Sequence, residues 1–299
     1  MRLLRVWLLL AALRLVTAAP LAAQQGISSD DFESGNTFGW DLSVGETSLV
    51  PADAFRMTDL DLRDPHLFVD VPVAGCSDFT DTPLPFGLGP SFNDGIATAI
   101  AGDGDGDGFL DLSVLLLFRP FDEAAAALRL DLARGSCPPP AAATTCGLDL
   151  AILPQTSDYD GFAAGQCLTA VAGTTSGYVP GVAEPAGPCF ASQPRALMPL
   201  TLQDITLPLR DVQSAAAFAG SPVTDLQDGL LRGFLSEADA DATLLPAGLP
   251  LVGGQPVSVL LPGGTGNCAA GDDRDMHLGT TGWWFYLNYS GTDVPYTGI

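Results

Sequence analysis

Short apolar segments separated by turn-forming residues constrain the fold of this chain more than any other feature of its sequence. Residues 128–132 (LRLDL) alternate apolar and charged side chains, so the three leucines share one face of an extended strand. Similar short apolar segments occur at 67–69, 110–118, 148–153, 205–209 and 283–289. The 34 Gly and 24 Pro are spread along the chain at turn-like spacing, which favours many short strands over long helices. We therefore predict an all-β fold with little helix.

The architecture that we expect from this pattern is a β-sandwich of the jelly-roll kind, built as a single domain over residues 24–299. Hydrophobic residues make up 47% of the chain and charged residues 16%, a balance typical of a globular protein with a core. Loop insertions are expected around 134–147 and 172–196, where Pro, Ala and Gly are frequent. Both insertions contain cysteine, so we interpret them as loops stapled by disulfides and not as flexible linkers.

Residues 1–23 have the order of a secretory signal peptide. Two arginines precede an apolar stretch at 6–13, and small residues follow up to Ala23. The apolar stretch ends at Arg14 and is far shorter than the roughly 20 residues of a membrane-spanning helix. We expect cleavage after Ala23, export of the mature chain and no insertion into a membrane.

Six cysteines agree with an oxidising compartment, because an even number in an exported chain indicates disulfides. No CxxC pair occurs, so a zinc ribbon has no support, although metal ligation or free buried thiols remain alternatives. Sequence alone allows many pairings. Short loops favour the pairs Cys137 with Cys146 and Cys167 with Cys189, which leaves Cys76 to pair with Cys268.

The charge balance excludes two classes of partner. The chain has 35 acidic residues against 12 arginines and no lysine, which gives a formal net charge of −23. Binding to nucleic acid or to an anionic membrane surface depends on clustered cations. We therefore expect neither nucleic acid nor an anionic membrane as a partner.

Residues 103–111 (DGDGDGFLD) carry the clearest chemical signal in the sequence. Aspartates stand at loop positions 1, 3, 5 and 9, and Gly108 stands at position 6, where a calcium loop turns sharply. Carboxylates packed this closely repel one another unless a cation is bound, and Ca²⁺ accepts about six to eight oxygen ligands. The spacing therefore predicts a Ca²⁺ site in this loop.

This segment resembles the DxDxDGxxD calcium loops of the integrin-type repeat and of dockerin modules. The resemblance implies Ca²⁺ held by the side chains of Asp103, Asp105, Asp107 and Asp111 together with the carbonyl of Phe109. The helix-loop-helix form of such a loop has a Glu at position 12, where this chain has valine, and the following residues are typical of a strand. A structural ion, an ion that bridges to an external ligand and a solvated turn without metal all stay open.

A second resemblance covers the start of the mature chain. The segment from Asp31 to Trp40 is similar to the first strand of secreted bacterial β-sandwich modules, among them carbohydrate-binding jelly rolls. An ordinary edge strand with a turn and a buried Trp is the alternative interpretation.

Aromatic residues near the C-terminus offer a further candidate surface. Alternation along residues 283–289 places Trp284, Tyr286 and Asn288 on the face opposite Trp283. Trp284 and Tyr286 form a sugar-stacking platform if their face is exposed, and they are ordinary packing if it is covered.

Familiar catalytic motifs are scarce. His66 and His277 are the only histidines, neither lies in an HExxH motif, and no GxSxG or GxxxxGK[ST] motif occurs. His66 follows an Asp-Pro pair, which is typical of a surface turn, and a Ser-His-Asp triad or a carboxylate pair stays open. We expect a secreted, non-catalytic surface, matrix or carbohydrate-contacting module whose partner is a glycan or another extracellular protein. A secreted polysaccharide or ester hydrolase with structural calcium is the alternative.

Overall fold

The computed structural model describes residues 52–202 and 205–298. They belong to one compact unit that spans Thr47–Ile299. The expected signal peptide at 1–23 and the segment from Asp31 to Trp40 lie outside the described residues. Within the described part of the chain, no helix is both long and apolar enough to cross a membrane.

Strands dominate the described residues, which confirms the prediction of a mainly β chain with little helix. The strands are β1 (Asp53–Asp64), β2 (Phe68–Val71), β3 (Gly75–Asp78), β4 (Val114–Arg119), β5 (Leu128–Ser136), β6 (Gly147–Leu148), β7 (Gln155–Phe162), β8 (Cys189–Ser192), β9 (Arg195–Leu202), β10 (Ile205–Gly220), β11 (Val223–Ser236), β12 (Asp275–His277) and β13 (Thr280–Val294). The helices are α2 (Phe92–Ala101), α3 (Glu237–Ala242) and the 3₁₀ turns η2 (Pro85–Gly87), η3 (Ala141–Ala143) and η4 (Val257–Leu260).

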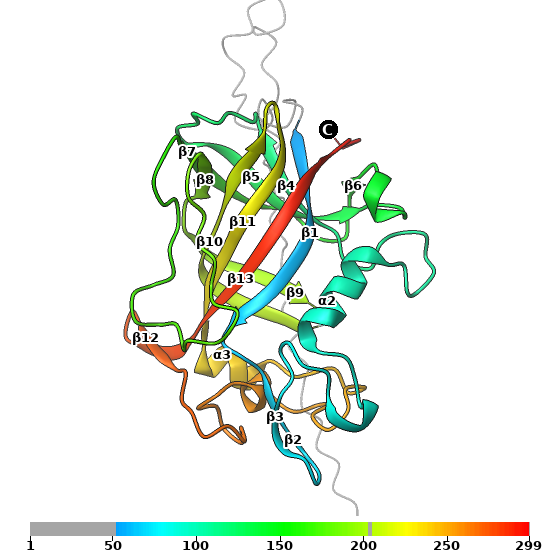
Figure 1. Cartoon of the computed structure of the whole chain (residues 1–299), viewed down its shortest axis with the longest axis vertical. Coiled ribbons are helices and arrows are strands. Elements are labelled where there is room, and N and C mark those ends of the chain that lie inside the picture. Colours follow the sequence, from blue (N-terminus) through cyan, green and yellow to red (C-terminus); the bar gives the residue numbers. More distant parts are fainter. Residues whose placement is uncertain (1–51, 203–204, 299) are drawn as a thin grey trace, which may run out of the picture. The chain divides into compact units, whose positions relative to one another are not determined.

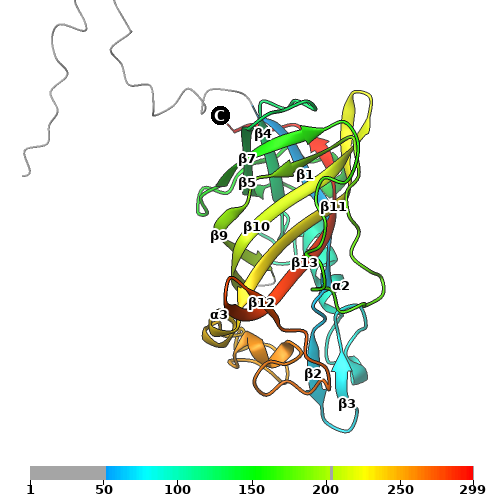
Figure 2. The ribbon, with the colours of Figure 1, turned by 90° about the vertical axis from the view of Figure 1, so that its left-hand side faces the viewer.

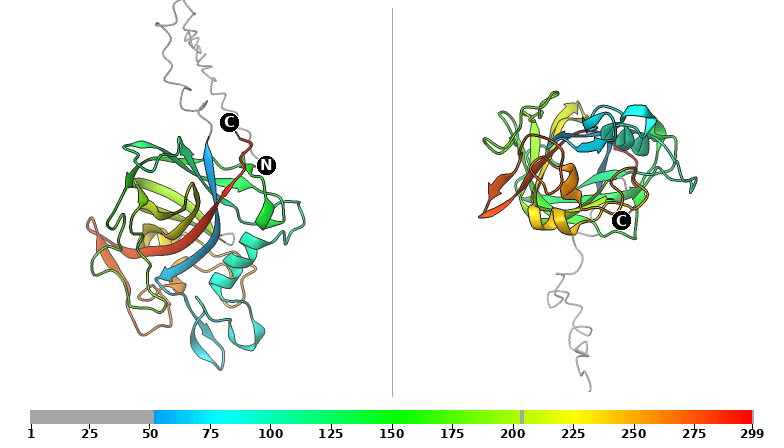
Figure 3. Two further views of the ribbon diagram at one scale, coloured as in Figure 1. Left: turned by 45° about the horizontal axis from the view of Figure 1, so that its top comes forward. Right: turned by 90° about the horizontal axis from the view of Figure 1, so that it is seen from below.

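The strands close into an antiparallel barrel of eight strands, so the expectation of a sandwich is wrong. Each barrel strand pairs with the next one along the chain, in the order β1, β4, β5, β7, β8, β10, β11 and β13, and β13 returns to pair with β1. Figure 1 shows this closure, with β13 in red beside β1 in blue. The view at the left of Figure 3 shows the strands arranged around a common interior.

Long, irregular strands allow the sheet to close on itself. β10 has 16 residues and β13 has 15. The β10–β11 register shifts between Arg210 and Gln213, and the β1–β13 register shifts between Met57 and Asp59. Such bulges bend a strand and increase its twist. The alternating pattern in the sequence is the same for a sandwich and a barrel, because it reports which face is buried and not which strands pair.

Aromatic side chains fill part of the barrel interior. The ring of Phe118 on β4 lies 5.0 Å from that of Phe190 on β8 and 4.9 Å from that of Tyr159 on β7, between ring centroids. β4 and β8 are not neighbours in the sheet, so these rings meet across the interior. Phe118, Tyr159 and Phe190 are fully buried. Burial of such rings contributes a large share of the apolar stabilisation of the barrel.

Two long loops cover apolar patches on the outside of the barrel. The loop between Cys137 and Cys146 lies against a cluster that includes Leu115 and Leu117, which alternate with inward-facing residues of β4. The segment 163–188 lies against a second cluster of β8, β10, β11 and β13. Strand β8 lies within the residues 172–196 that the sequence assigns to a loop insertion.

One strand expected from the sequence is largely a turn. Residues 148–153 contribute only the end of β6, and Leu150 and Leu153 are 86% and 79% exposed. The side chain of Asp149 accepts a hydrogen bond from the amide of Ala151, which is the geometry of an Asx turn. This local hydrogen bond competes with the extended conformation that the apolar residues favour.

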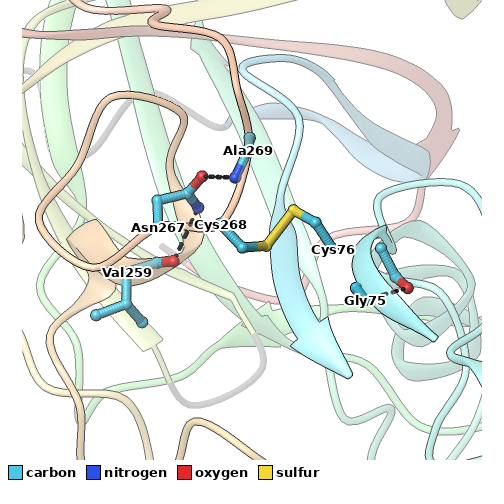
Figure 4. Close-up of a disulfide and its surroundings, with 7 residues drawn as sticks. Gly75, Cys76, Val259, Asn267, Cys268 and Ala269 are labelled. Atoms are coloured by element: carbon cyan, nitrogen blue, oxygen red, sulfur yellow. Dashed lines mark hydrogen bonds between the residues drawn. A yellow bond between two sulfur atoms is a disulfide. The ribbon is translucent and has the colours of Figure 1, made fainter. Parts of the chain in front are cut away.

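All six cysteines form disulfides, namely the two short-loop pairs Cys137–Cys146 and Cys167–Cys189 and the pair that they leave, Cys76–Cys268, as expected from the sequence. Figure 4 shows Cys76–Cys268, which joins the β2–β3 hairpin to the segment after η4. The side chain of Asn267 holds that segment, because it donates to the carbonyl of Val259 and accepts from the amide of Ala269, at 2.8 Å each. Figure 2 shows the hairpin and this segment at the same end of the barrel.

The Cys76–Cys268 bond spans 192 residues, so its removal should cost more stability than any local change nearby. We expect the double variant Cys76→Ala/Cys268→Ala to lose about 5 kcal/mol of unfolding free energy, because the unfolded chain regains the entropy of a long closed loop. Urea unfolding of the oxidised proteins measures the loss. The control Ser77→Ala, which removes one hydrogen bond in the same hairpin, should lose about 1 kcal/mol or less. Equal losses in the two proteins would contradict this account.

Candidate functional site

The aspartate loop lies between the end of α2 and the start of β4. Its two ends are joined by backbone hydrogen bonds, from the amide of Asp111 to the carbonyl of Gly102 and from the amide of Leu112 to the carbonyl of Ala99, at 2.9 Å each. The buried guanidinium of Arg56 donates to the carbonyl of Ile100 in the last turn of α2, at 3.3 Å. The two ends of the loop are therefore held close together by hydrogen bonds.

Three of the predicted ligands come together in this loop. One carboxylate oxygen from each of Asp103, Asp105 and Asp111 lies within 4.8 Å of the other two. Asp107 is not part of this group, and its carboxylate accepts a hydrogen bond from the amide of Phe109 at 2.8 Å. The structure thus brings together three of the four aspartates that the resemblance implies as ligands.

Backbone amides arrange these carboxylates. Asp103 accepts hydrogen bonds from the amides of Gly106 and Gly108, at 2.8 and 3.1 Å, and both glycines have positive φ. Asp111 accepts from the amide of Gly104 at 3.0 Å. Residues with side chains rarely adopt the backbone conformation of Gly106 and Gly108, so glycine is required for this wrapping. The Gly-Asp alternation in the sequence therefore serves the loop geometry as well as its charge.

The donor set suits a hard divalent cation. All three converging groups are carboxylates with at least partial exposure, so an ion can reach them from solvent. Ca²⁺ prefers oxygen ligands and tolerates irregular geometry. No nitrogen or sulfur ligand joins this group in the described residues, which makes the site a poor match for softer metals.

A polar depression of about 580 Å³ borders the loop. Its lining includes Asp105, Asp107 and Phe109 from the loop and Arg134, Asp149 and Thr201 from the barrel side. Arg134 donates to the carbonyl of Asp111 at 3.3 Å and forms an ion pair with Asp149 at 3.4 Å. The ring of Phe109 is 43% exposed beside these charges.

The second candidate surface from the sequence is covered. Trp284 is 5% exposed and Tyr286 is fully buried beneath the segment 163–188. The hydroxyl of Tyr286 accepts a hydrogen bond from the amide of Val171, and Asn288 exchanges hydrogen bonds with the backbone of Ala183. The alternation of the two faces is as expected, but these side chains hold a loop in place and form no exposed platform.

His66 is a buried residue, whereas the sequence pattern indicated a surface turn. It is 5% exposed, and its ring stacks on Tyr178 with centroids 3.8 Å apart. Its Nδ1 lies 2.6 Å from a carboxylate oxygen of Asp78. Burial by itself raises the pKa of Asp78, but hydrogen bonds from His66 and Thr80 bring it below its ordinary value. Local sequence held no signal for this pairing, because Asp78 reaches His66 through the β2–β3 hairpin.

Asp64, at the end of β1, is another carboxyl with an unusual environment. It is 3% exposed and accepts a hydrogen bond from the amide of Ser176 at 2.6 Å. Burial raises the pKa of Asp64 to about 7; the hydrogen bond from Ser176 opposes this shift, and the charge of Asp273 adds to it. The folded protein therefore binds a proton at Asp64 more tightly than the unfolded chain does.

Because the pKa of Asp64 is raised in the folded state, its contribution to stability is complete below about pH 4 and is lost as pH rises to about 7. This loss of unfolding free energy amounts to about 4 kcal/mol in the parent, and we expect Asp64→Asn to remove it. Between pH 4.5 and pH 8 the variant should therefore lose less unfolding free energy than the parent. Urea unfolding across this range measures the difference. The exposed control Asp70→Asn should leave the slope unchanged, and a parallel curve for Asp64→Asn would refute the assignment.

Comparison with protein-family models, with curated proteins and with solved structures finds no match for this chain. The chemistry of its own residues therefore carries the functional argument.

Proposed function

We propose that this chain is an exported β-barrel protein that binds Ca²⁺ through residues 103–111 and contacts an extracellular ligand beside the ion. The convergence of the Asp103, Asp105 and Asp111 carboxylates within 4.8 Å carries the proposal. Three acidic groups at this distance repel one another, and a divalent cation removes that repulsion. Asp107 and the carbonyl of Phe109 would be the further oxygen ligands that the loop spacing offers.

Export is supported by two independent features. Three disulfides are typical of proteins that fold in an oxidising compartment. The order of charged, apolar and small residues in 1–23 is that of a secretory signal. Calcium is abundant outside cells, so a loop of modest affinity would be filled there.

The depression beside the loop is the surface that we assign to the ligand. It combines carboxylates, a guanidinium, a hydroxyl and an exposed aromatic ring, from Asp149, Arg134, Thr201 and Phe109. Sugar hydroxyls pair well with carboxylates and guanidinium groups, and a sugar ring stacks on an aromatic face. A glycan therefore fits this surface better than an apolar ligand, and another extracellular protein remains the second kind of partner.

Calcium binding predicts a stability that depends on the metal. At free Ca²⁺ about 100 times Kd the protein gains about 2.7 kcal/mol, so excess EDTA should lower Tm by about 5–10 °C. The variant Asp105→Asn, which keeps a hydrogen-bond acceptor, should show little response to Ca²⁺ or EDTA. Differential scanning calorimetry measures both, with Asp70→Asn as the charge-matched control. An unchanged Tm of the parent protein in excess EDTA would contradict the calcium assignment.

The ligand surface predicts calcium-dependent glycan binding. On a glycan array the mature protein should retain a sugar in Ca²⁺ and lose at least tenfold of the signal in EDTA. Phe109→Ala should weaken binding similarly without changing Tm, because the ring is partly exposed. Phe162→Ala, on β7 with a comparable exposed fraction of 38%, is the matched control. Binding that survives both EDTA and Phe109→Ala would place the ligand elsewhere.

A further inference from the structure

We propose that His66 and Asp81 form a binding site for one divalent transition-metal cation of the zinc class, separate from the aspartate loop. His66 lies between β1 and β2, and Asp81 lies in the segment that follows β3. The Nε2 atom of His66 and a carboxylate oxygen of Asp81 face each other at 3.8 Å.

The tautomer of His66 follows from its partner. An ionised carboxylate only accepts hydrogen bonds, so the Nδ1 atom that lies 2.6 Å from Asp78 carries the proton. When the ring is neutral and Nδ1 carries the proton, Nε2 has a free electron pair. A carboxylate that orients the opposite nitrogen in this way is the usual support of a metal-bound histidine.

His66 is only 5% exposed, yet its Nε2 atom has no hydrogen-bond partner among the described residues. The facing oxygen of Asp81 is also an electron-pair donor. Two such donors attract nothing from each other, and 3.8 Å is too long for an N–H···O hydrogen bond. A cation between them satisfies both.

Asp81 is oriented toward this gap. Its other carboxylate oxygen accepts a hydrogen bond from the side-chain amide of Asn93 at 2.7 Å. Asn93 is buried and is itself fixed by two hydrogen bonds with the backbone of Leu62, at 2.9 and 3.0 Å. Each side chain is therefore held through its other polar atom: His66 through Nδ1, which contacts Asp78, and Asp81 through the carboxylate oxygen that contacts Asn93.

The separation is close to what a metal requires. Tetrahedral zinc with nitrogen and oxygen ligands at about 2.0–2.2 Å places those ligands about 3.4 Å apart. The side chain of Asp81 is 34% exposed, so it can approach by the few tenths of an ångström that are needed. Open zinc centres have three protein ligands and one water, so a site with two protein ligands would need two water molecules to complete a tetrahedron.

The surrounding charge favours a cation. Burial raises the pKa of Asp61, and the negative charges of nearby Asp59, Asp81 and Asp94 raise it further, while Arg63 opposes them. Arg63 is paired with Asp61 at 2.5 Å. Carboxylates therefore outnumber cationic groups around Asp81, and their field attracts a positive ion.

Nitrogen NMR of the imidazole rings tests this site directly, because the chain has only two histidines. We would add Zn²⁺ to the mature protein in saturating Ca²⁺, so that the aspartate loop is occupied. The expected result is a shift of the His66 Nε2 resonance that saturates at one Zn²⁺ per chain, while the His277 resonances stay in place.

Two variants and a control sharpen the test. Asp81→Asn should weaken Zn²⁺ binding at least tenfold in titration calorimetry, and His66→Phe, which keeps a ring against Tyr178, should abolish it. His277→Phe, in which the histidine paired with Asp211 is lost, should bind Zn²⁺ like the parent. No shift of His66 in the parent protein, or unchanged Zn²⁺ binding in folded Asp81→Asn or His66→Phe, would overturn the proposal.

Discussion

Pairing between β1 and β13 holds the described structure together, because it joins the first and last barrel strands and leaves the barrel without an edge. The pairing runs from Ala54 opposite Val294 to Asp64 opposite Tyr286. β13 also pairs with β11 along most of its length, so it has hydrogen-bonded neighbours on both sides. An open sheet of these strands would expose backbone groups to other chains, and closure removes that liability.

Closure also determines where the two proposed sites lie. The barrel interior is packed with rings such as Phe118 and Phe190, so both proposed sites are on the outside and at the ends of the barrel. The aspartate loop precedes β4 at the base of α2, where Arg56 from β1 reaches the helix end. The His66 and Asp81 pair lies beyond the end of β1, near the hairpin that Cys76–Cys268 tethers.

The sequence predicted several strands and the three disulfides, but it did not predict the closure of the barrel or most contacts between distant segments. Alternation identified residues 128–132 and 283–289 as strands with two distinct faces, and the spacing of Asp and Gly located a loop in which carboxylates converge. It did not distinguish a barrel from a sandwich, because both bury one face of each strand. It also did not predict that the segment 163–188 covers Trp284, because the two are far apart in the sequence. It did not predict that His66 pairs with Asp78, because the β2–β3 hairpin brings them together only after folding.

The helix α2 shows that some missed features did carry a signal. Ser91 caps it by accepting a hydrogen bond from the amide of Asp94, and Ile96 and Ile100 are buried at a spacing of four residues. A cap followed by this spacing is typical of a helix start. The helix has only 10 residues and is flanked by turn-forming Gly, Pro and Asp, so its apolar residues resemble another short strand between turns.

Anomalous diffraction from crystals grown in Ca²⁺ tests the central claim most directly, namely that residues 103–111 form a cation site. The account predicts one anomalous peak at about 2.3–2.6 Å from carboxylate oxygens of Asp103, Asp105 and Asp111. A well-ordered loop without such a peak at millimolar Ca²⁺ would contradict it.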